Sequence, residues 1–84
     1  MILKIYENKT INTIFELEIN GVIYYSYYLK SIIEYVKTER IPNKDVQKSF
    51  EETVKSNKYE IFTYEFENVD ELTKEFVQEL IWNM

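Results

Sequence analysis

The sequence predicts a small α+β domain with the element order β-β-β-α-α-β-α, a mostly antiparallel sheet and helices packed on one face. Three observations predict it. Residues 11–19 alternate between apolar and polar side chains and run directly into Asn20-Gly21, the strongest short hairpin signal. Residues 29–36 change to helical spacing, and residues 59–67 alternate again. With 84 residues, the whole chain (1–84) is predicted to be one domain.

Three strands are expected in the first third of the chain, at residues 2–7, 11–19 and 22–27. The Asn-Gly pair suits a two-residue turn because both central positions of a type I′ turn need a positive φ. Such a turn fixes the register, which pairs Ile19 with Val22, Leu17 with Tyr24, and Phe15 with Ser26. The other face then carries Ile14, Ile23, Tyr25 and Tyr27 beside Glu16 and Glu18.

The tyrosine-rich segment 24–28 allows two interpretations. As a strand it places tyrosines on both faces of the sheet and leaves one face open. As a helix it would align Tyr25 with Leu29, Ile32 and Val36 in one core stripe, and the open tyrosine face would be lost.

Three helices are expected. The first has the apolar stripe Leu29, Ile32, Ile33 and Val36, and it begins either at a capping box formed by Ser31 and Glu34 or nearer Tyr28. The second begins after Asn43 and ends at a left-handed Asn57, with the stripe Val46, Phe50 and Val54. The third, capped by Asn68 or Asp70, runs to about Asn83 with the stripe Val69, Leu72, Phe76, Val77, Leu80 and Ile81.

The composition argues against enzymatic function. The chain has no cysteine and no histidine, which excludes thiolate and imidazole chemistry, and a single glycine excludes a glycine-rich phosphate loop. The adjacent acidic pairs Glu51-Glu52 and Asp70-Glu71 point about 100° apart on a helix. We therefore expect no catalytic residues, no metal site and no cofactor, with a carboxylate-only magnesium or calcium site as the open alternative.

Charge is distributed unevenly along the chain. Residues 59–84 hold seven acidic residues and one lysine, so they carry more than the whole net charge of −5. On the last helix, Glu71, Glu75, Gln78 and Trp82 fall on one line. This pattern indicates either a solvated face or a negative surface for a basic partner. The candidate partner-binding residues are Glu65, Glu67, Asp70, Glu71, Glu75, Gln78, Glu79 and Trp82, together with Tyr25 and Tyr27.

Direct binding to nucleic acid or to a membrane is not expected. A single arginine and a pI near 4.7 leave little cation to neutralise phosphates. The longest apolar stretch, residues 22–29, is far shorter than the ~20 residues that a membrane span needs. The start of the chain carries no signal-peptide pattern, so a cytoplasmic location is expected. An exposed tyrosine face would instead suit a homodimer interface.

Isoleucine, lysine, asparagine, tyrosine and phenylalanine make up 40 of the 84 residues, which indicates AT-rich coding. In length and acidity the chain resembles small accessory proteins of phages and mobile elements, including anti-CRISPR and anti-restriction inhibitors. That resemblance implies a non-enzymatic protein-binding inhibitor that occludes a basic nucleic-acid-handling site on its partner. The alternatives are a structural or regulatory homodimer paired through the tyrosine-rich hairpin, and an antitoxin or immunity-type protein.

Overall fold

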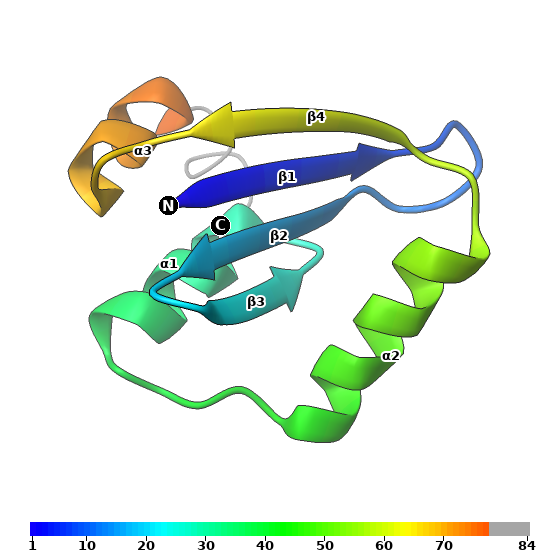
Figure 1. The fold of residues 1–84 in the computed structure, drawn as a ribbon, viewed down its shortest axis with the longest axis horizontal. Helices are drawn as coiled ribbons and strands as arrows, with labels where there is room; N and C mark the ends of the chain where they lie inside the picture. Colours follow the sequence, from blue (N-terminus) through cyan, green and yellow to red (C-terminus); the bar gives the residue numbers. More distant parts are fainter. Residues whose placement is uncertain (78–84) are drawn as a thin grey trace.

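The computed structural model describes residues 1–77, and within them it shows a four-stranded antiparallel sheet with three helices (Figure 1). The strand order is β3-β2-β1-β4. In chain order the elements are β1 (Ile2–Glu7), β2 (Ile14–Ile19), β3 (Val22–Ser26), α1 (Leu29–Lys37), α2 (Lys44–Ser56), β4 (Glu60–Glu65) and α3 (Val69–Glu75). The expected α+β class, element order and antiparallel sheet are confirmed.

The β2–β3 hairpin has the predicted register, with Ile19 opposite Val22 and Leu17 opposite Tyr24. Asn20 and Gly21 both have a positive φ, 50° and 80°, as a type I′ turn requires. β2 begins at Ile14 rather than at residue 11, because its ladder with β1 ends at the Tyr6–Ile14 pair and its ladder with β3 ends at Phe15–Ser26. The preceding connection is held by a turn at Asn8. The Asn8 carboxamide oxygen accepts hydrogen bonds from the Thr10 amide and hydroxyl, both at 2.8 Å.

One face of the sheet is covered by α1 and α3. Its central residues, Leu3 and Leu17, are fully buried, and so are Leu29 and Ile32 of α1 and Leu72 of α3. The same cluster includes Ile5, Phe15, Ile33, Phe66 and Phe76. This is the main core of the domain. It forms because every second residue of the strands faces the apolar stripes of α1 and α3.

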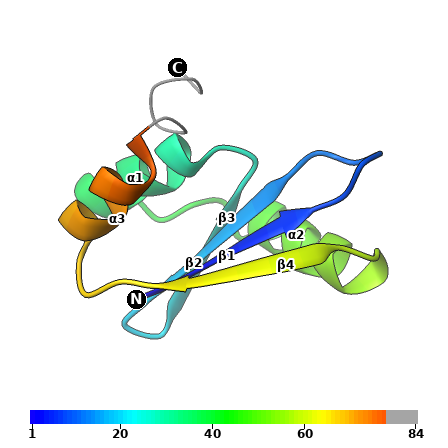
Figure 2. The same ribbon diagram turned by 90° about the horizontal axis from the view of Figure 1, so that it is seen from above.

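The opposite face is covered by α2, which corrects the expectation of helices on one face (Figure 2). Tyr6, Ile14 and Tyr25 are buried on that face, where Phe50 and Val54 of α2 pack against them. The physical reason is that β1, β2 and β3 each carry apolar side chains on both faces. A helix on one face would leave this second cluster in water, at a cost of about 25 cal/mol per Å² of apolar surface.

The helix boundaries follow the predicted caps in part. Asn43 caps α2, and its side-chain oxygen accepts from the amides of Asp45 (2.9 Å) and Val46 (3.1 Å). α1 begins at Leu29 with Tyr28 as its N-cap, so Ser31 lies inside the helix. Asn57 is extended rather than left-handed, because its side chain instead donates to the Thr53 carbonyl at 2.9 Å.

At the C-terminal end, Asn68 rather than Asp70 caps α3, accepting from the Glu71 amide at 2.9 Å. Of its predicted stripe, Leu72 and Phe76 are buried, Val69 is partly buried, and Val77 is exposed. The predicted continuation to about Asn83, with Leu80 and Ile81, lies outside the described residues. No helix within residues 1–77 is long and apolar enough to cross a membrane.

Candidate functional site

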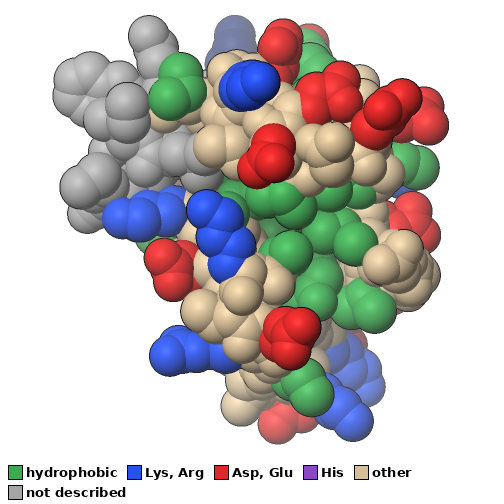
Figure 3. Space-filling model, turned by 90° about the vertical axis from the view of Figure 1, so that its left-hand side faces the viewer, with side chains coloured by type: hydrophobic (Ala, Val, Ile, Leu, Met, Phe, Trp, Pro, Cys, Tyr) green, Lys and Arg blue, Asp and Glu red, His purple; other side chains and the backbone are tan. Residues whose placement is uncertain are grey.

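The strongest charged feature is an acidic surface at one end of the molecule. We define it by five exposed carboxylates, which come from the end of β4, the following loop and α3: Glu65, Glu67, Asp70, Glu71 and Glu75. Figure 3 faces the end of the molecule at which α3 lies, and acidic side chains gather across its upper part. Between residues 59 and 77, Lys74 is the only basic side chain. The sequence-predicted carboxylates of this region that lie within residues 1–77 are thus all exposed on consecutive elements.

Glu71 differs from the other members of the acidic surface because it holds the start of α3. Its amide donates to the Asn68 side chain, and its carboxylate Oε2 accepts from the Glu67 amide at 3.1 Å. This reciprocal arrangement resembles a capping box, which satisfies amides that the helix leaves free. The side chains of Glu65, Glu67, Asp70 and Glu75 form no hydrogen bond or ion pair with another residue in the described part of the chain.

Three predicted members of this surface, Gln78, Glu79 and Trp82, lie outside the described residues. Of the predicted line on the last helix, the described residues hold Glu71 and Glu75, both exposed.

The two candidate tyrosines occupy different environments. Segment 24–28 includes the end of β3 and not a helix, so the alternation places Tyr25 on the face that α2 covers. Tyr25 is only 8% exposed, and its ring stacks against Phe50 with 6.3 Å between centroids. Tyr27 remains 45% exposed and meets Phe50 edge-on at 4.8 Å. The Tyr25 ring thus belongs to the packing of α2, and Tyr27 keeps a surface available to a partner.

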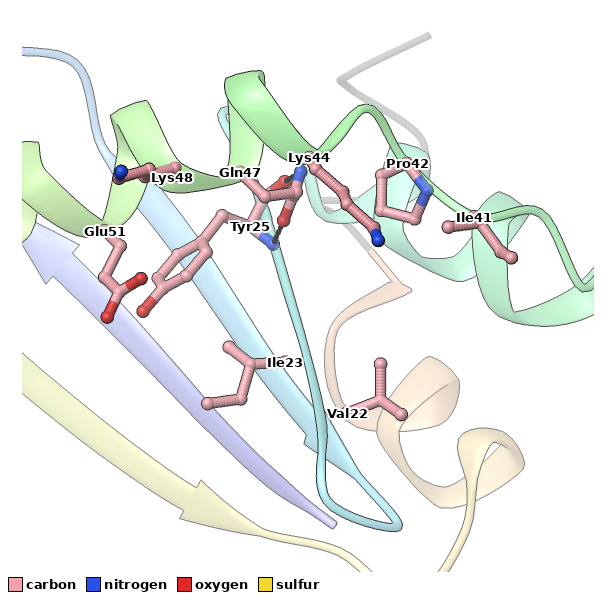
Figure 4. A pocket seen from close by; sticks show the side chains of 9 residues that line it. All are labelled: Val22, Ile23, Tyr25, Ile41, Pro42, Lys44, Gln47, Lys48 and Glu51. Atoms are coloured by element: carbon pink, nitrogen blue, oxygen red, sulfur yellow. Dashed lines mark hydrogen bonds between the residues drawn. The ribbon is translucent and has the colours of Figure 1, made fainter.

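A groove that sequence reasoning missed lies between β3, the α1–α2 loop and the first turns of α2 (Figure 4). Its volume is about 470 Å³, and Ile41 on its rim is 86% exposed. The lining residues are Val22, Ile23, Tyr25, Ile41, Pro42, Lys44, Gln47, Lys48 and Glu51. The only sequence signal was an apolar Ile41-Pro42 pair inside a loop.

Gln47 lines this groove and joins its two sides through hydrogen bonds. Its side-chain oxygen accepts from the Tyr25 amide at 2.6 Å, and its side-chain nitrogen donates to the Tyr25 carbonyl at 3.0 Å. Figure 4 shows both hydrogen bonds spanning the gap between α2 and β3. Beyond them, the side chains of Val22 and Ile23 form the apolar side of the groove, with Lys44 and Lys48 on the helix opposite.

A buried polar cluster lies beneath α2. Glu16 is 8% exposed, and the Tyr6 hydroxyl donates to its carboxylate at 2.9 Å. Burial raises the pKa of Tyr6 and of Tyr25 well above the usual tyrosine value, and the neighbouring Glu16 carboxylate adds to both shifts. Both hydroxyls therefore stay protonated above the pH at which an unperturbed tyrosine ionises. The nearby Tyr59 hydroxyl is buried and has no hydrogen-bond partner in the structure as described.

Within residues 1–77, no group of three or more acidic side chains converges as a metal site would require. Comparisons with protein-family models, with curated proteins and with solved structures found no match.

Proposed function

We propose that this protein is a non-enzymatic, protein-binding inhibitor whose acidic surface occupies a basic, nucleic-acid-handling site on another protein. The observation that carries the proposal is the run of five exposed carboxylates between residues 65 and 75, with Lys74 as the single basic side chain among them. Four of the five form no hydrogen bond or ion pair through their side chains among residues 1–77. A surface that forms few internal ion pairs leaves its field free to act on a partner.

Carboxylates on a folded surface can stand in for the phosphates that a nucleic-acid-binding site recognises. A concentration of one sign of charge raises association rates by about 10–10³-fold, and the effect falls steeply with ionic strength. Complementary charge also disfavours partners of the wrong sign. The same field disfavours direct binding of this chain to nucleic acid.

The acidic surface is mounted on a well-packed support. Leu72 of α3 is fully buried, and Phe66 and Phe76 meet edge-on with 5.9 Å between ring centroids. Tyr64 stacks on Phe66 and meets Phe76 edge-on, so three aromatic rings join β4 to α3. Carboxylates held on such a support lose less conformational entropy on binding than carboxylates on a mobile segment.

The AT-rich composition and the resemblance in bulk properties favour a phage or mobile-element source and an anti-CRISPR or anti-restriction role, with the protein acting in the cytoplasm. An antitoxin or immunity-type protein would use the same surface in the same way. The identity of the partner separates these two: a nuclease of a defence system supports the first, and a toxin encoded beside this chain supports the second.

The test needs charge reversal that leaves the fold intact. Glu71 is unsuitable because it holds the start of α3. We choose the double variant Glu67→Lys and Glu75→Lys, whose side chains are exposed and unpaired in the described structure. The matched control is Glu34→Lys and Glu52→Lys, which changes the net charge by the same amount on the exposed faces of α1 and α2.

Each protein is immobilised and exposed to a nuclease-treated lysate of a low-GC bacterium that carries defence systems. We expect one basic nucleic-acid-processing protein to be retained by the wild type and by the control. The acidic-surface variant should lose it, and added duplex DNA should displace it. Equal retention by the acidic-surface variant, no displacement by DNA, or no protein retained by the wild type would each contradict the proposal.

A further inference from the structure

The outer edge of β4 is an unpaired strand edge. β4 lies at the end of the sheet and pairs only with β1 within the described residues. All six of its residues are exposed, including Ile61 at 54% and Phe62 and Tyr64 at 37% each. An exposed apolar strand of this length is a ready template for pairing with another strand.

The register shows which main-chain groups of β4 are free. Met1 and Phe66 exchange two main-chain hydrogen bonds, of 2.8 and 2.9 Å, at the end of the β1–β4 ladder. Because hydrogen-bonded and non-hydrogen-bonded pairs alternate in an antiparallel ladder, Tyr64 and Phe62 also bond to β1. The amides and carbonyls of Ile61, Thr63 and Glu65 therefore point away from β1, toward solvent.

The opposite edge of the sheet is protected at Tyr25. There the Gln47 side chain occupies the outward amide and carbonyl of Tyr25, in the place of a neighbouring strand. α2 also contacts β3 along this edge. Among residues 1–77, no comparable contact protects β4. The two edges thus differ: β3 has a hydrogen-bond partner for its outward groups at Tyr25, and β4 has none among the described residues. β4 is also the longer strand and has more exposed apolar side chains.

We propose that a second copy of this chain pairs with the open edge, so that two β4 strands lie antiparallel about a two-fold axis at Thr63. In an antiparallel pair, directly opposite residues lie on the same face of the sheet. A two-fold axis perpendicular to the sheet must therefore set one residue of β4 opposite the same residue of the second copy. An axis at Thr63 aligns Thr63 with itself and Ile61 with Glu65, and all three outward-facing residues of each strand then form hydrogen-bonded pairs. With an axis at Phe62 or Tyr64, one of the three outward-facing residues would have no partner within β4 of the second copy.

The same register is favourable for the side chains. It sets Phe62 opposite Tyr64 of the second copy, on the face where Tyr64 already packs against Phe66 and Phe76. Aromatic cross-strand pairs stabilise antiparallel strands by ~0.2–1 kcal/mol each. No two acidic residues are placed directly opposite each other, because Glu65 faces Ile61 and Glu60 lies opposite Phe66.

The assembly is expected to stop at two copies. Joining two sheets through β4 leaves β3 at both outer edges, where Gln47 already binds the outward amide and carbonyl of Tyr25. A two-fold interface that consumes the open edge closes on itself, whereas a head-to-tail contact would continue. Because each copy carries a net charge of −5, pairing should strengthen as salt screens the repulsion. Partner binding through the acidic surface should instead weaken with salt.

A single cysteine tests the register directly, because the chain has none of its own. In a hydrogen-bonded antiparallel pair the Cα atoms are ~5.5 Å apart, within the range that a disulfide spans. Thr63→Cys should therefore form a disulfide-linked dimer under mild oxidation. The matched control is Ile61→Cys on the same face, whose copies would lie four residues apart, about 13 Å, and should stay largely monomeric.

Light scattering across a concentration series is the second measurement. The wild type should reach a dimeric mass as concentration rises, and Thr63→Pro, which removes an outward-facing amide, should stay monomeric; Thr63→Val should behave as the wild type. Equal crosslinking at positions 61 and 63, a wild type that is monomeric at every concentration, or growth beyond two copies would overturn the proposal. Thr63→Pro keeps the acidic surface, so it should still retain the lysate partner. The dimer proposal and the inhibitor proposal can therefore fail independently.

Discussion

Gln47 binds both main-chain polar groups of Tyr25, although 22 positions separate the two residues in the sequence. One end of the Gln47 amide accepts from the Tyr25 N–H, and the other end donates to the Tyr25 carbonyl, as a neighbouring β-strand would do. The contact joins α2 to the edge of the sheet. It also places the Tyr25 ring against Phe50, so a polar and an aromatic contact act at the same position.

Replacing Gln47 with alanine should destabilise the domain by about 1–3 kcal/mol, because the part-buried amide and carbonyl of Tyr25 would lose their partners. The measurement is urea-induced unfolding followed by circular dichroism. Lys48→Ala, one residue along the same helix and exposed, is the control and should change the free energy of unfolding by less than about 0.5 kcal/mol. Similar values for the two variants would show that the contact contributes little in solution.

Burial of Tyr6 and Tyr25 beside the Glu16 carboxylate predicts a loss of stability at alkaline pH. The pKa values of Tyr6 and Tyr25 are raised in the folded state, so both hydroxyls stay protonated where an unfolded tyrosine ionises, near pH 10. The stabilising effect is fully present below that pH. Because the unfolded state releases protons first, the free energy of unfolding should fall as pH rises above about 10.

Tyr6→Phe tests this pH dependence. The variant should be less stable at pH 7 by about 1–3 kcal/mol, because the buried Glu16 carboxylate loses a donor. Above pH 10 its stability should fall less steeply than that of the wild type, since one group with a raised pKa is gone. Tyr28→Phe, at an exposed position, provides the comparison. An unchanged alkaline slope in Tyr6→Phe would contradict the assignment.

The hairpin and the N-caps of α2 and α3 could be predicted because their signals are local. Asn20-Gly21 specifies its turn through backbone conformation, and alternation carries the register outward from it. The side of the sheet that α2 covers could not be predicted in the same way. Tyr6, Ile14 and Tyr25 form an apolar surface that must be buried, but no local sequence pattern indicates which helix packs against it.

In the candidate site, too, local features could be predicted and features that join distant residues could not. Composition located the acidic surface, because charge accumulates in one stretch of sequence that becomes adjacent elements. The burial of Tyr25 and the edge contact of Gln47 depend on residues far apart in the chain. The open edge of β4 follows only from the strand order, in which the fourth strand pairs with the first.

Gly21→Ala should destabilise the hairpin through backbone strain rather than through a clash. Gly21 has φ of +80°, and a Cβ at this position would meet nothing within 4 Å. A left-handed conformation costs a residue with a side chain about 1–2 kcal/mol, so that is the expected loss on thermal or urea unfolding. Gly21→Asn should lose less, because asparagine tolerates this conformation better. Equal losses for the two variants would point to a cause other than φ.

The acidic surface should separate into a stabilising residue and residues free to bind. Asn68→Ala should cost about 0.5–2 kcal/mol, since the amide of Glu71 would lose its acceptor. Glu71→Gln keeps an acceptor for the Glu67 amide and should retain most of the stability, whereas Glu71→Ala should not. Glu75→Ala should be neutral or slightly stabilising, because a negative charge in the last turn opposes the helix dipole. If Glu75→Ala destabilised α3 as much as Glu71→Ala, then Glu75 would have a structural role, and its exposure would no longer favour partner binding.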